Sequence, residues 1–202
     1  MDGHSKSGQP PERYRLFVAI ELPEAVKQAI ENTQDELRAA LPAESIRWTR
    51  REQFHLTMRF LGSVEAPQVD RLNEALRRAC TGSGELQLRA GRIGVFPGGR
   101  RPRVVWAGVD DGAGKLLLLQ RSIEGATASF TNEPPQEKFT GHITLARCRE
   151  INRTDAATLA TLVDKMAARS FGEWTAASVE VIRSQPTSRG SRYTTLASVS
   201  LV

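Results

Sequence analysis

Two stretches, "QFHLTMRF" at residues 53–60 and "TGHITLAR" at residues 140–147, contain two of the three histidines of the chain. Each reads His, apolar, Thr, apolar, and side chains two residues apart on a strand point to the same face. We therefore predict two strands, one presenting His55 beside Thr57 and the other presenting His142 beside Thr144. The alternate residues are expected to face the core: Leu56, Met58 and Phe60 in the first strand, and Ile143 and Leu145 in the second.

The regions around these stretches repeat one order of elements. Hydrophobic periodicity, interrupted by Pro and Gly, predicts strand, helix, His-containing strand, helix and strand in each half. The two histidines are 142 − 55 = 87 residues apart in a chain of 202 residues, which fits a degenerate internal duplication. We expect two α+β lobes related by a pseudo-twofold axis, with the two His-Thr pairs facing each other over a cleft.

The same periodicity gives approximate boundaries. The expected strands are 13–22, 45–48, 54–62, 85–96, 103–109, 142–146, 174–182 and 193–201, with a loop at 183–192 joining the last two. The expected helices are 23–41, 66–80, 116–130 and 154–168, and the first begins at Pro23, a residue that is favoured at helix starts.

Composition is that of one globular domain, with 40% hydrophobic and 25% charged residues. We expect a single bilobal domain at residues 13–202, preceded by a flexible tail at residues 1–12. No apolar stretch is long enough to cross a membrane, and the polar start does not resemble a signal peptide. Cys80 and Cys148 are expected to be reduced thiols. These features favour a cytoplasmic monomer without a membrane partner.

Positive charge is concentrated in one segment of the chain. The net charge is +5, and Leu86 to Val109 contains no Asp or Glu. That segment carries five arginines: Arg89, Arg92, Arg100, Arg101 and Arg103. A solvated face and an anion-binding surface are both consistent with this pattern.

Two imidazoles and two hydroxyls suit acid–base chemistry on a phosphate ester. Histidine can act as base or acid near neutral pH, and a neutral and a protonated imidazole form a couple for in-line displacement. Hydroxyls can donate hydrogen bonds to phosphoryl oxygens. No carboxylate cluster accompanies either histidine, so we predict neither a metal site nor another cofactor. A serine hydrolase is disfavoured because the sequence has no G-x-S-x-G motif.

The paired "HLTMRFLG" and "HITLAR" resemble the two signatures of the two-histidine (2H) phosphoesterase superfamily. Within it, the chain is similar to the RNA 2′,3′-cyclic phosphodiesterases, also called 2′-5′ RNA ligases. "RLFVAI", "GVFPGGRRPRVVWAGV" and "SQPTSRGSRYTTLASVSL" extend the resemblance over nearly all of the chain from Arg13. It implies two lobes, each an antiparallel sheet backed by helices, with the active-site cleft between them.

The resemblance also implies an activity and residue roles. The activity is hydrolysis of a terminal 2′,3′-cyclic phosphate to a 2′-phosphomonoester, with reversible 2′-5′ joining of RNA ends as a related reaction. His55 would be the proton donor and His142 the proton acceptor. Thr57 and Thr144 would bind the phosphate, and Arg147 resembles the phosphate-contacting arginine of the family. Substrates would be RNA ends, tRNA halves among them.

Gly141 departs from the family pattern, and Arg147 does not fit the alternation of side chains along its strand. The family usually has Pro before the second histidine, where this chain has Gly141, which loosens the backbone. Strict alternation puts Arg147 on the face opposite His142, so it can reach a phosphate only if the strand ends or bulges near Ala146. Arg59, by contrast, is expected to share the face of His55.

Several further residues are candidates for binding the rest of an RNA end. Arginines bind backbone phosphates and aromatic rings stack on bases. The candidates are Arg59, Arg100, Arg101, Arg103, Phe17 and Tyr193, with Trp48 and Phe96 as additional rings. Two alternatives stay open: a cyclic phosphodiesterase acting on a small nucleotide such as ADP-ribose cyclic phosphate, and an RNA-binding module without turnover.

Overall fold

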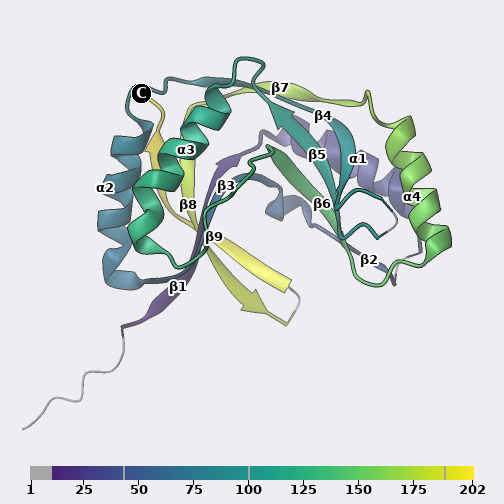
Figure 1. The fold of residues 1–202 in the computed structure, drawn as a ribbon, viewed down its shortest axis with the longest axis horizontal. Coiled ribbons are helices and arrows are strands. Elements are labelled where there is room, and N and C mark those ends of the chain that lie inside the picture. Colours follow the sequence, from purple (N-terminus) through teal and green to yellow (C-terminus); the bar gives the residue numbers. More distant parts are fainter. Residues whose placement is uncertain (1–10, 43, 100, 189) are drawn as a thin grey trace, which may run out of the picture.

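A computed structural model describes residues 11–42, 44–99, 101–188 and 190–202. Within them, nine strands and four α-helices follow one another along the chain (Figure 1). In chain order they are β1 (Arg13–Glu21), α1 (Glu24–Ala40), β2 (Ile46–Trp48), β3 (His55–Glu65), α2 (Val69–Cys80), β4 (Leu86–Phe96), β5 (Val104–Asp110), α3 (Lys115–Thr127), β6 (His142–Cys148), α4 (Arg153–Lys165), β7 (Ser170–Ala176), β8 (Ser178–Thr187) and β9 (Gly190–Ser200).

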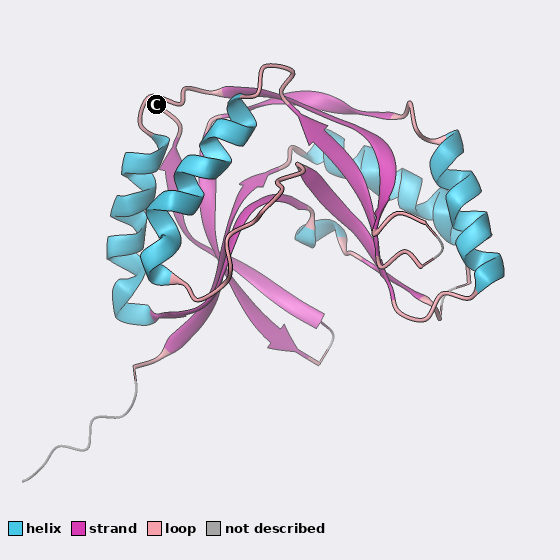
Figure 2. Ribbon diagram, in the orientation of Figure 1, coloured by secondary structure: helices cyan, strands magenta, loops and turns pink. Residues whose placement is uncertain are grey.

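The strands form one curled antiparallel sheet in the order β7-β4-β5-β6-β3-β1-β8-β9, with β2 paired to β6. The two His-containing strands, β6 and β3, are neighbours at its centre. We call β3, β1, β8 and β9 the β3 half, and β6, β5, β4, β7 and β2 the β6 half. The helices cover the outer face of each half and leave the inner faces turned toward each other (Figure 2). The predicted α+β fold of two pseudo-symmetric lobes is confirmed.

The lobes of the structure do not coincide with the halves of the sequence. Helices α2 and α3 pack together and cover the β3 half, while α1 and α4 contact β7 and β4 of the β6 half. Helix α1 therefore follows β1 in the chain but packs on the other lobe, and α3 does the same after β5. This exchange of helices ties the two lobes together.

The main core lies between the sheet and the helices. Helix α1 buries one stripe that includes Val26, Ile30 and Leu37, as its periodicity predicts. Strand β1 is buried from Leu16 to Ile20, because helices cover one of its faces and aromatic side chains cover the other. A small second cluster of Phe17, Ala19 and Ile182, packed against Tyr193, lies apart from the main core.

Two expectations about the C-terminal strands were wrong. The predicted strand 174–182 is broken at Ala177, because the chain crosses from β7 at one edge of the sheet to β8 beside β1. The predicted loop 183–192 is mostly strand, since β8 and β9 stay paired as far as Thr187 and Gly190. Polar residues hid this hairpin from the periodicity, because its arms extend beyond the helices (Figure 1).

The predicted tail lies largely outside the described residues, which begin at Pro11. Glu12, which belongs to the predicted tail, is held in place: its carbonyl accepts a hydrogen bond from the Ala66 N–H at 2.8 Å, and its carboxylate lies 3.3 Å from Arg183. Among the described residues, no helix is both long and apolar enough to cross a membrane.

Candidate active site

The register of the two central strands brings the predicted pairs together. Leu56 of β3 pairs with Ile143 of β6 in antiparallel orientation. One residue to either side of this pair, His55 comes opposite Thr144, and Thr57 comes opposite His142. Residues opposite each other on neighbouring strands have Cβ atoms about 5 Å apart. Each imidazole therefore stands close to the hydroxyl of the other sequence half, across the pseudo-twofold axis.

Both imidazoles are anchored in the same way. The Nδ1 of His55 lies 2.7 Å from the carbonyl oxygen of Gln53, and the Nδ1 of His142 lies 2.8 Å from that of Thr140. A carbonyl can only accept, so Nδ1 donates in both rings and carries the proton of the neutral form. This leaves Nε2 of each ring as the atom that can give or take a proton at a substrate.

The pKa of each histidine lies below its ordinary value in the unliganded protein. Burial lowers the pKa of His55 to about 4, and the charges of His142 and Arg147 act in the same direction. Burial also lowers the pKa of His142, with a further contribution from Arg147. The hydrogen bonds to Gln53 and Thr140 act against these shifts without cancelling them. Both rings are therefore neutral at pH 7 before an anion enters.

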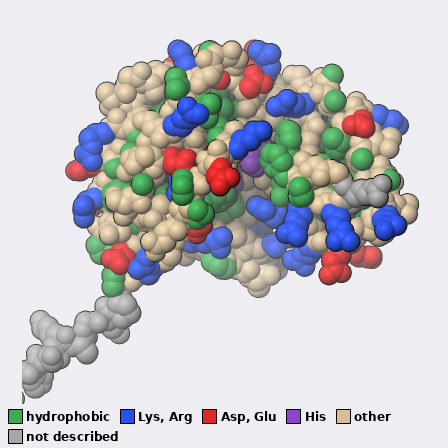
Figure 3. Space-filling model, viewed as in Figure 1, with side chains coloured by type: hydrophobic (Ala, Val, Ile, Leu, Met, Phe, Trp, Pro, Cys, Tyr) green, Lys and Arg blue, Asp and Glu red, His purple; other side chains and the backbone are tan. Residues whose placement is uncertain are grey.

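A cavity of about 570 Å³ opens between the two halves. His55, Thr57, Thr144 and Arg147 line it, and His142 is half-buried on the same face of β6 as Thr144. The lining further includes Arg15, Phe17, Arg47, Trp48, Gln53, Phe60, Glu133, Ser184, Ser191 and Tyr193. Figure 3 shows a histidine in the hollow between the halves, with Lys and Arg side chains gathered beside it.

A bulge in each central strand sets which residues reach the cavity. In β6, Thr144 pairs with Trp106 and Ala146 with Val105, so Leu145 is an extra residue. Leu145 and Ala146 are both buried, and Arg147 returns to the face of Thr144. This is the bulge that the sequence required if Arg147 was to reach a phosphate. Gln34, itself buried, supports it by donating a hydrogen bond of 2.7 Å to the carbonyl of Leu145.

Strand β3 has the matching bulge, and it overturns two expectations. Thr57 pairs with Ala19 and Arg59 with Val18, so Met58 is the extra residue. Phe60, predicted to face the core, is 54% exposed and lines the cavity. Arg59, predicted to share the His55 face and to bind RNA, is only 6% exposed and points to the other side.

The contacts of Arg59 explain its burial. Its guanidinium donates to the carbonyls of Glu133 and Pro134 at 2.8 and 2.7 Å, and it lies 3.1 Å from the carboxylate of Glu124. Arg59 therefore ties the segment after α3 to β3 and to α3 itself. These contacts fix the wall of the cleft at this point, and the charge of Arg59 is paired with that of Glu124.

The candidate aromatic rings surround the two histidines. The ring of His55 lies 4.8 Å from that of Phe17 and 5.5 Å from that of Tyr193. On the other side, His142 packs edge-on against Phe96 at 5.2 Å. Phe17 and Tyr193 both line the cavity, as does Trp48. Phe17 is nearly fully buried, so its first role is to hold His55 in position.

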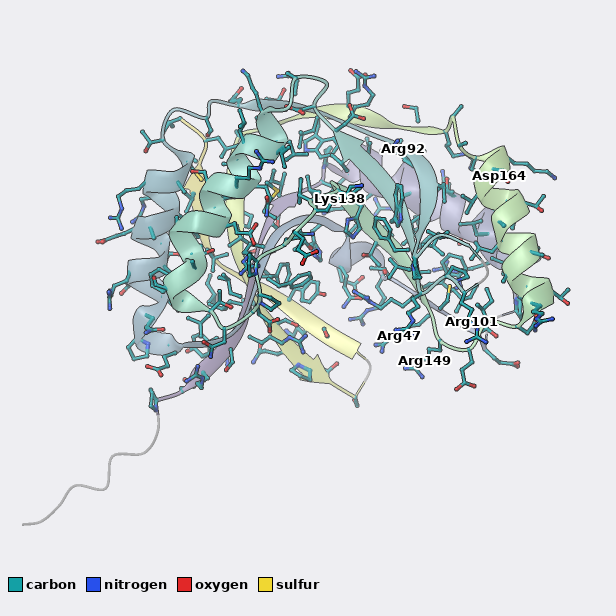
Figure 4. The ribbon with its side chains drawn as sticks, in the orientation of Figure 1. Arg47, Arg92, Arg101, Lys138, Arg149 and Asp164 are labelled. Atoms are coloured by element: carbon teal, nitrogen blue, oxygen red, sulfur yellow. The ribbon has the colours of Figure 1, made fainter. Side chains whose placement is uncertain are left out.

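The basic segment that follows β4 contributes little to the cavity. Arg101 and Arg103 are exposed but are not among the residues that line it, and Arg100 lies outside the described residues. Arg89 pairs with Glu173 at 3.2 Å on the neighbouring strand β7. In Figure 4, Arg101 is labelled near Arg47 and Arg149 along the lower edge of the β6 half. Any contact of Arg101 or Arg103 with RNA would therefore lie beyond the cavity.

Sequence reasoning did not single out Arg15, Arg47, Gln53, Ser184 and Ser191, which also line the cavity. The alternation of β1 gives a signal for Arg15, since Phe17 was already a candidate and lies two residues away. No local signal exists for Ser184 and Ser191, because they belong to the hairpin of β8 and β9 that was expected to be a loop. Tertiary structure alone brings them to the site.

Gly141 enters β6 where a side chain has no room. A Cβ on this residue would lie 2.5 Å from the carbonyl oxygen of Val109 and 3.2 Å from Leu116. The carbonyl of Gly141 also accepts a hydrogen bond of 2.9 Å from Val109. Close packing therefore holds the backbone before His142, although glycine itself imposes no rigidity.

His55, two hydroxyls and a guanidinium at one cavity, with the half-buried His142 on the Thr144 face of β6, form a set of groups suited to acid–base chemistry on a phosphate ester. The profile of the family described as LigT-like phosphoesterases matches residues 20–106 and 108–193. The chain belongs to this family. Each matched segment contains one of the two His-containing strands.

Two relatives, each named RNA 2′,3′-cyclic phosphodiesterase, illustrate the similarity. The protein of Aeropyrum pernix is 34% identical over 148 residues, which cover 73% of this chain and 82% of the relative. The protein of Aquifex aeolicus is 28% identical over 181 residues, covering 89% of this chain and 93% of the relative.

Solved structures of the same fold cover nearly the whole chain. A crystal structure of a Thermus thermophilus protein superposes with a TM-score of 0.75 at 27% identity, covering 93% of this chain and 97% of that one. Escherichia coli LigT in complex with 3′-AMP superposes with a TM-score of 0.74 at 25% identity, covering 95% and 99%.

Proposed function

We propose that this protein hydrolyses RNA 2′,3′-cyclic phosphate ends to 2′-phosphomonoesters without a metal ion. The observation that carries the proposal is the pair of imidazoles anchored through Nδ1: His55 lines the cavity with Thr57, Thr144 and Arg147, and His142 is half-buried on the Thr144 face of β6. The names of the relatives and the 3′-AMP bound to Escherichia coli LigT support the substrate class. Because both halves contribute to the site, we also propose that residues 13–202 act as one domain.

In the proposed reaction, water attacks phosphorus and the bond from phosphorus to the 3′ oxygen breaks. His142 takes a proton from the water, and His55 gives a proton to the departing 3′ oxygen. Thr57, Thr144 and Arg147 donate hydrogen bonds to the non-bridging oxygens, where negative charge grows. The products are a 3′-hydroxyl and a 2′-phosphomonoester, and exchange with solvent restores both imidazoles.

The lowered pKa of His55 has to be reversed for it to act as the donor. A phosphate between the two rings brings a negative charge within a few ångströms, and an opposite charge raises the pKa of an imidazole. The substrate itself would thus create the protonated His55 that the reaction needs. This predicts that His55 gains its proton on binding and not before.

The first test is product analysis with an oligonucleotide that ends in a 2′,3′-cyclic phosphate. The protein is expected to release only the 2′-phosphomonoester, to work in excess EDTA, and to lose at least about 10²-fold in rate on either His55→Ala or His142→Ala. Tyr14→Phe serves as a control outside the cavity. Undiminished turnover by the double His variant, or loss of turnover in EDTA, would contradict the proposal.

The roles of the two histidines can be separated with a phosphodiester whose leaving group is p-nitrophenolate. That group departs without a proton, so it does not need a general acid. His55→Ala should therefore retain far more activity on this substrate than His142→Ala. Equal losses of activity in the two variants would contradict the proposed roles. A larger loss in His55→Ala would exchange them. Offering the 2′-phosphate product with a 5′-hydroxyl RNA would show whether the same site also joins 2′-5′ ends.

A further inference from the structure

Two like charges face each other at one end of the cavity. Arg47 of β2 and Arg147 of β6 are directly opposite in register, and both are exposed and line the cavity. Like charges at such positions repel each other. Among the ion pairs formed by the described residues, none includes Arg47 or Arg147. An anion between the two guanidiniums would remove this repulsion.

Arg47 reaches from one half of the protein to the other. It belongs to the β6 half, yet its Nη2 lies 2.8 Å from the point where a Cβ of Gly190 would stand. Gly190 begins β9 in the β3 half and has a φ of +125°, so glycine is suited both to the backbone and to the space. The guanidinium of Arg47 therefore reaches the start of β9 in the other half of the protein.

The position of this pair relative to the histidines defines what it could bind. Arg147 stands three residues beyond Thr144, but because Leu145 is bulged these residues span only Trp106 to Val104 of β5, about 7 Å at roughly 3.3 Å per residue. Arg47 is level with Arg147 on the neighbouring strand β2, so the Arg147 guanidinium can contact the reacting phosphate and also share a second anion with Arg47. In a nucleotide, the next anion is the phosphate on the 5′ oxygen of the same ribose.

We propose that Arg47, helped by Arg147, binds the 5′-phosphate of the nucleoside whose 2′ and 3′ oxygens carry the reacting phosphate. The inference rests on the proposed function for the position of that reacting phosphate. Arginine suits this role because its planar fork can donate two hydrogen bonds to one phosphate. The site thus selects nucleotides with a 5′-phosphate, whether it comes from an RNA linkage or from a pyrophosphate, over nucleoside cyclic phosphates.

Binding of two product-like ligands tests the subsite without any need for turnover. Adenosine 2′-monophosphate and adenosine 2′,5′-bisphosphate differ only in the 5′-phosphate, and isothermal titration gives the Kd of each. We expect the bisphosphate to bind at least about tenfold more tightly, and Arg47→Met to reduce this preference to about threefold or less. Arg77→Met, which removes an exposed charge on α2, should leave the preference intact.

Two outcomes would overturn the inference. One is equal affinity of the unmodified protein for both ligands, and the other is a preference that survives Arg47→Met. Neither depends on hydrolysis, so a protein that fails to hydrolyse cyclic phosphates would contradict the proposed function and leave this test valid. Where hydrolysis is observed, kcat/KM can be compared for two substrates: the dinucleotide ApA with a 2′,3′-cyclic phosphate end, and adenosine 2′,3′-cyclic phosphate. The preference for the dinucleotide should fall about tenfold in Arg47→Met. The same measurement with ADP-ribose cyclic phosphate in place of the dinucleotide then shows whether Arg47 favours the 5′-phosphate of an RNA linkage or that of a pyrophosphate.

Discussion

Phe60 and Arg147 occupy equivalent positions, each five residues beyond the histidine of its strand and each brought to the cavity by a bulge. The duplication therefore gives the cleft two unlike ends. At these equivalent positions the β3 half has an exposed aromatic ring and the β6 half a guanidinium, whereas elsewhere in the lining Arg15 belongs to the β3 half and Trp48 to the β6 half. A nucleotide is also unlike at its two ends, with a base at one and phosphates at the other, so the asymmetry predicts one direction of binding.

Removing the ring of Phe60 should weaken substrate binding. Stacking of a base on an aromatic side chain is worth about 1–3 kcal/mol, which corresponds to roughly fivefold to 150-fold in affinity. Phe60→Ala is expected to raise KM or Kd by about this factor with little change in stability, because the ring is 54% exposed. Leu118→Ala, at an exposed apolar residue of α3, is the matched control. Unchanged affinity in Phe60→Ala would mean that the base lies elsewhere.

The bulge of β6 should depend on Gln34. This buried side chain donates to the carbonyls of Thr49 and Leu145 at 2.8 and 2.7 Å. Gln34→Leu leaves both carbonyls with one partner fewer, and loss of a buried hydrogen bond costs about 1–3 kcal/mol. We expect a lower free energy of unfolding in urea and weaker phosphate binding, since Arg147 is positioned by the same bulge. Gln28→Leu, on the exposed side of α1, should change neither quantity by a comparable amount.

The sequence predicts the regular strands and helices of this structure, but it does not predict the bulges that interrupt them. The two His-x-Thr strands, the four helices and the duplication follow from periodicities that every residue of an element shares. The sides of β3 on which Phe60 and Arg59 lie cannot be predicted in this way. One inserted residue, Met58, reverses the alternation of side chains along the strand, and no local sequence feature marks it. Arg47 was missed for a different reason: its position depends on which strand pairs with β6, and a three-residue strand carries no signal of its partner.

A side chain at residue 141 should disturb the entry to β6. The Cβ of an alanine there would lie 2.5 Å from the Val109 carbonyl, closer than two such atoms can approach, and proline would bring the same Cβ. Gly141→Ala is expected to cost about 1–3 kcal/mol of stability, typical of overpacking, and to lower kcat by displacing His142. Gly125→Ala, where α3 leaves open space, should be neutral or stabilising. A Gly141→Ala protein with normal stability and kcat would contradict this.

Arg147 should control the pKa of both histidines. Its charge contributes to lowering the pKa of His55 and of His142. Arg147→Met is therefore expected to raise both, which NMR titration of the ring protons can follow residue by residue. Binding of inorganic phosphate to the unmodified protein should shift both in the same direction, since it too adds negative charge or neutralises positive charge near the rings. A downward shift in either experiment would contradict the electrostatic account of the site.

The low pKa of His55 should also make the fold less stable in mild acid. The pKa is about 4 in the folded protein against 6.5 for an ordinary histidine, so the unfolded chain binds more protons between these values. The contribution of His55 to the free energy of unfolding is therefore fully present above about pH 6.5 and is lost progressively as the pH falls toward 4. Urea unfolding at pH 7 and pH 4.5 should show a smaller loss for His55→Asn than for the unmodified protein. Saturating phosphate should reduce the loss as well, because it favours the protonated ring in the folded state.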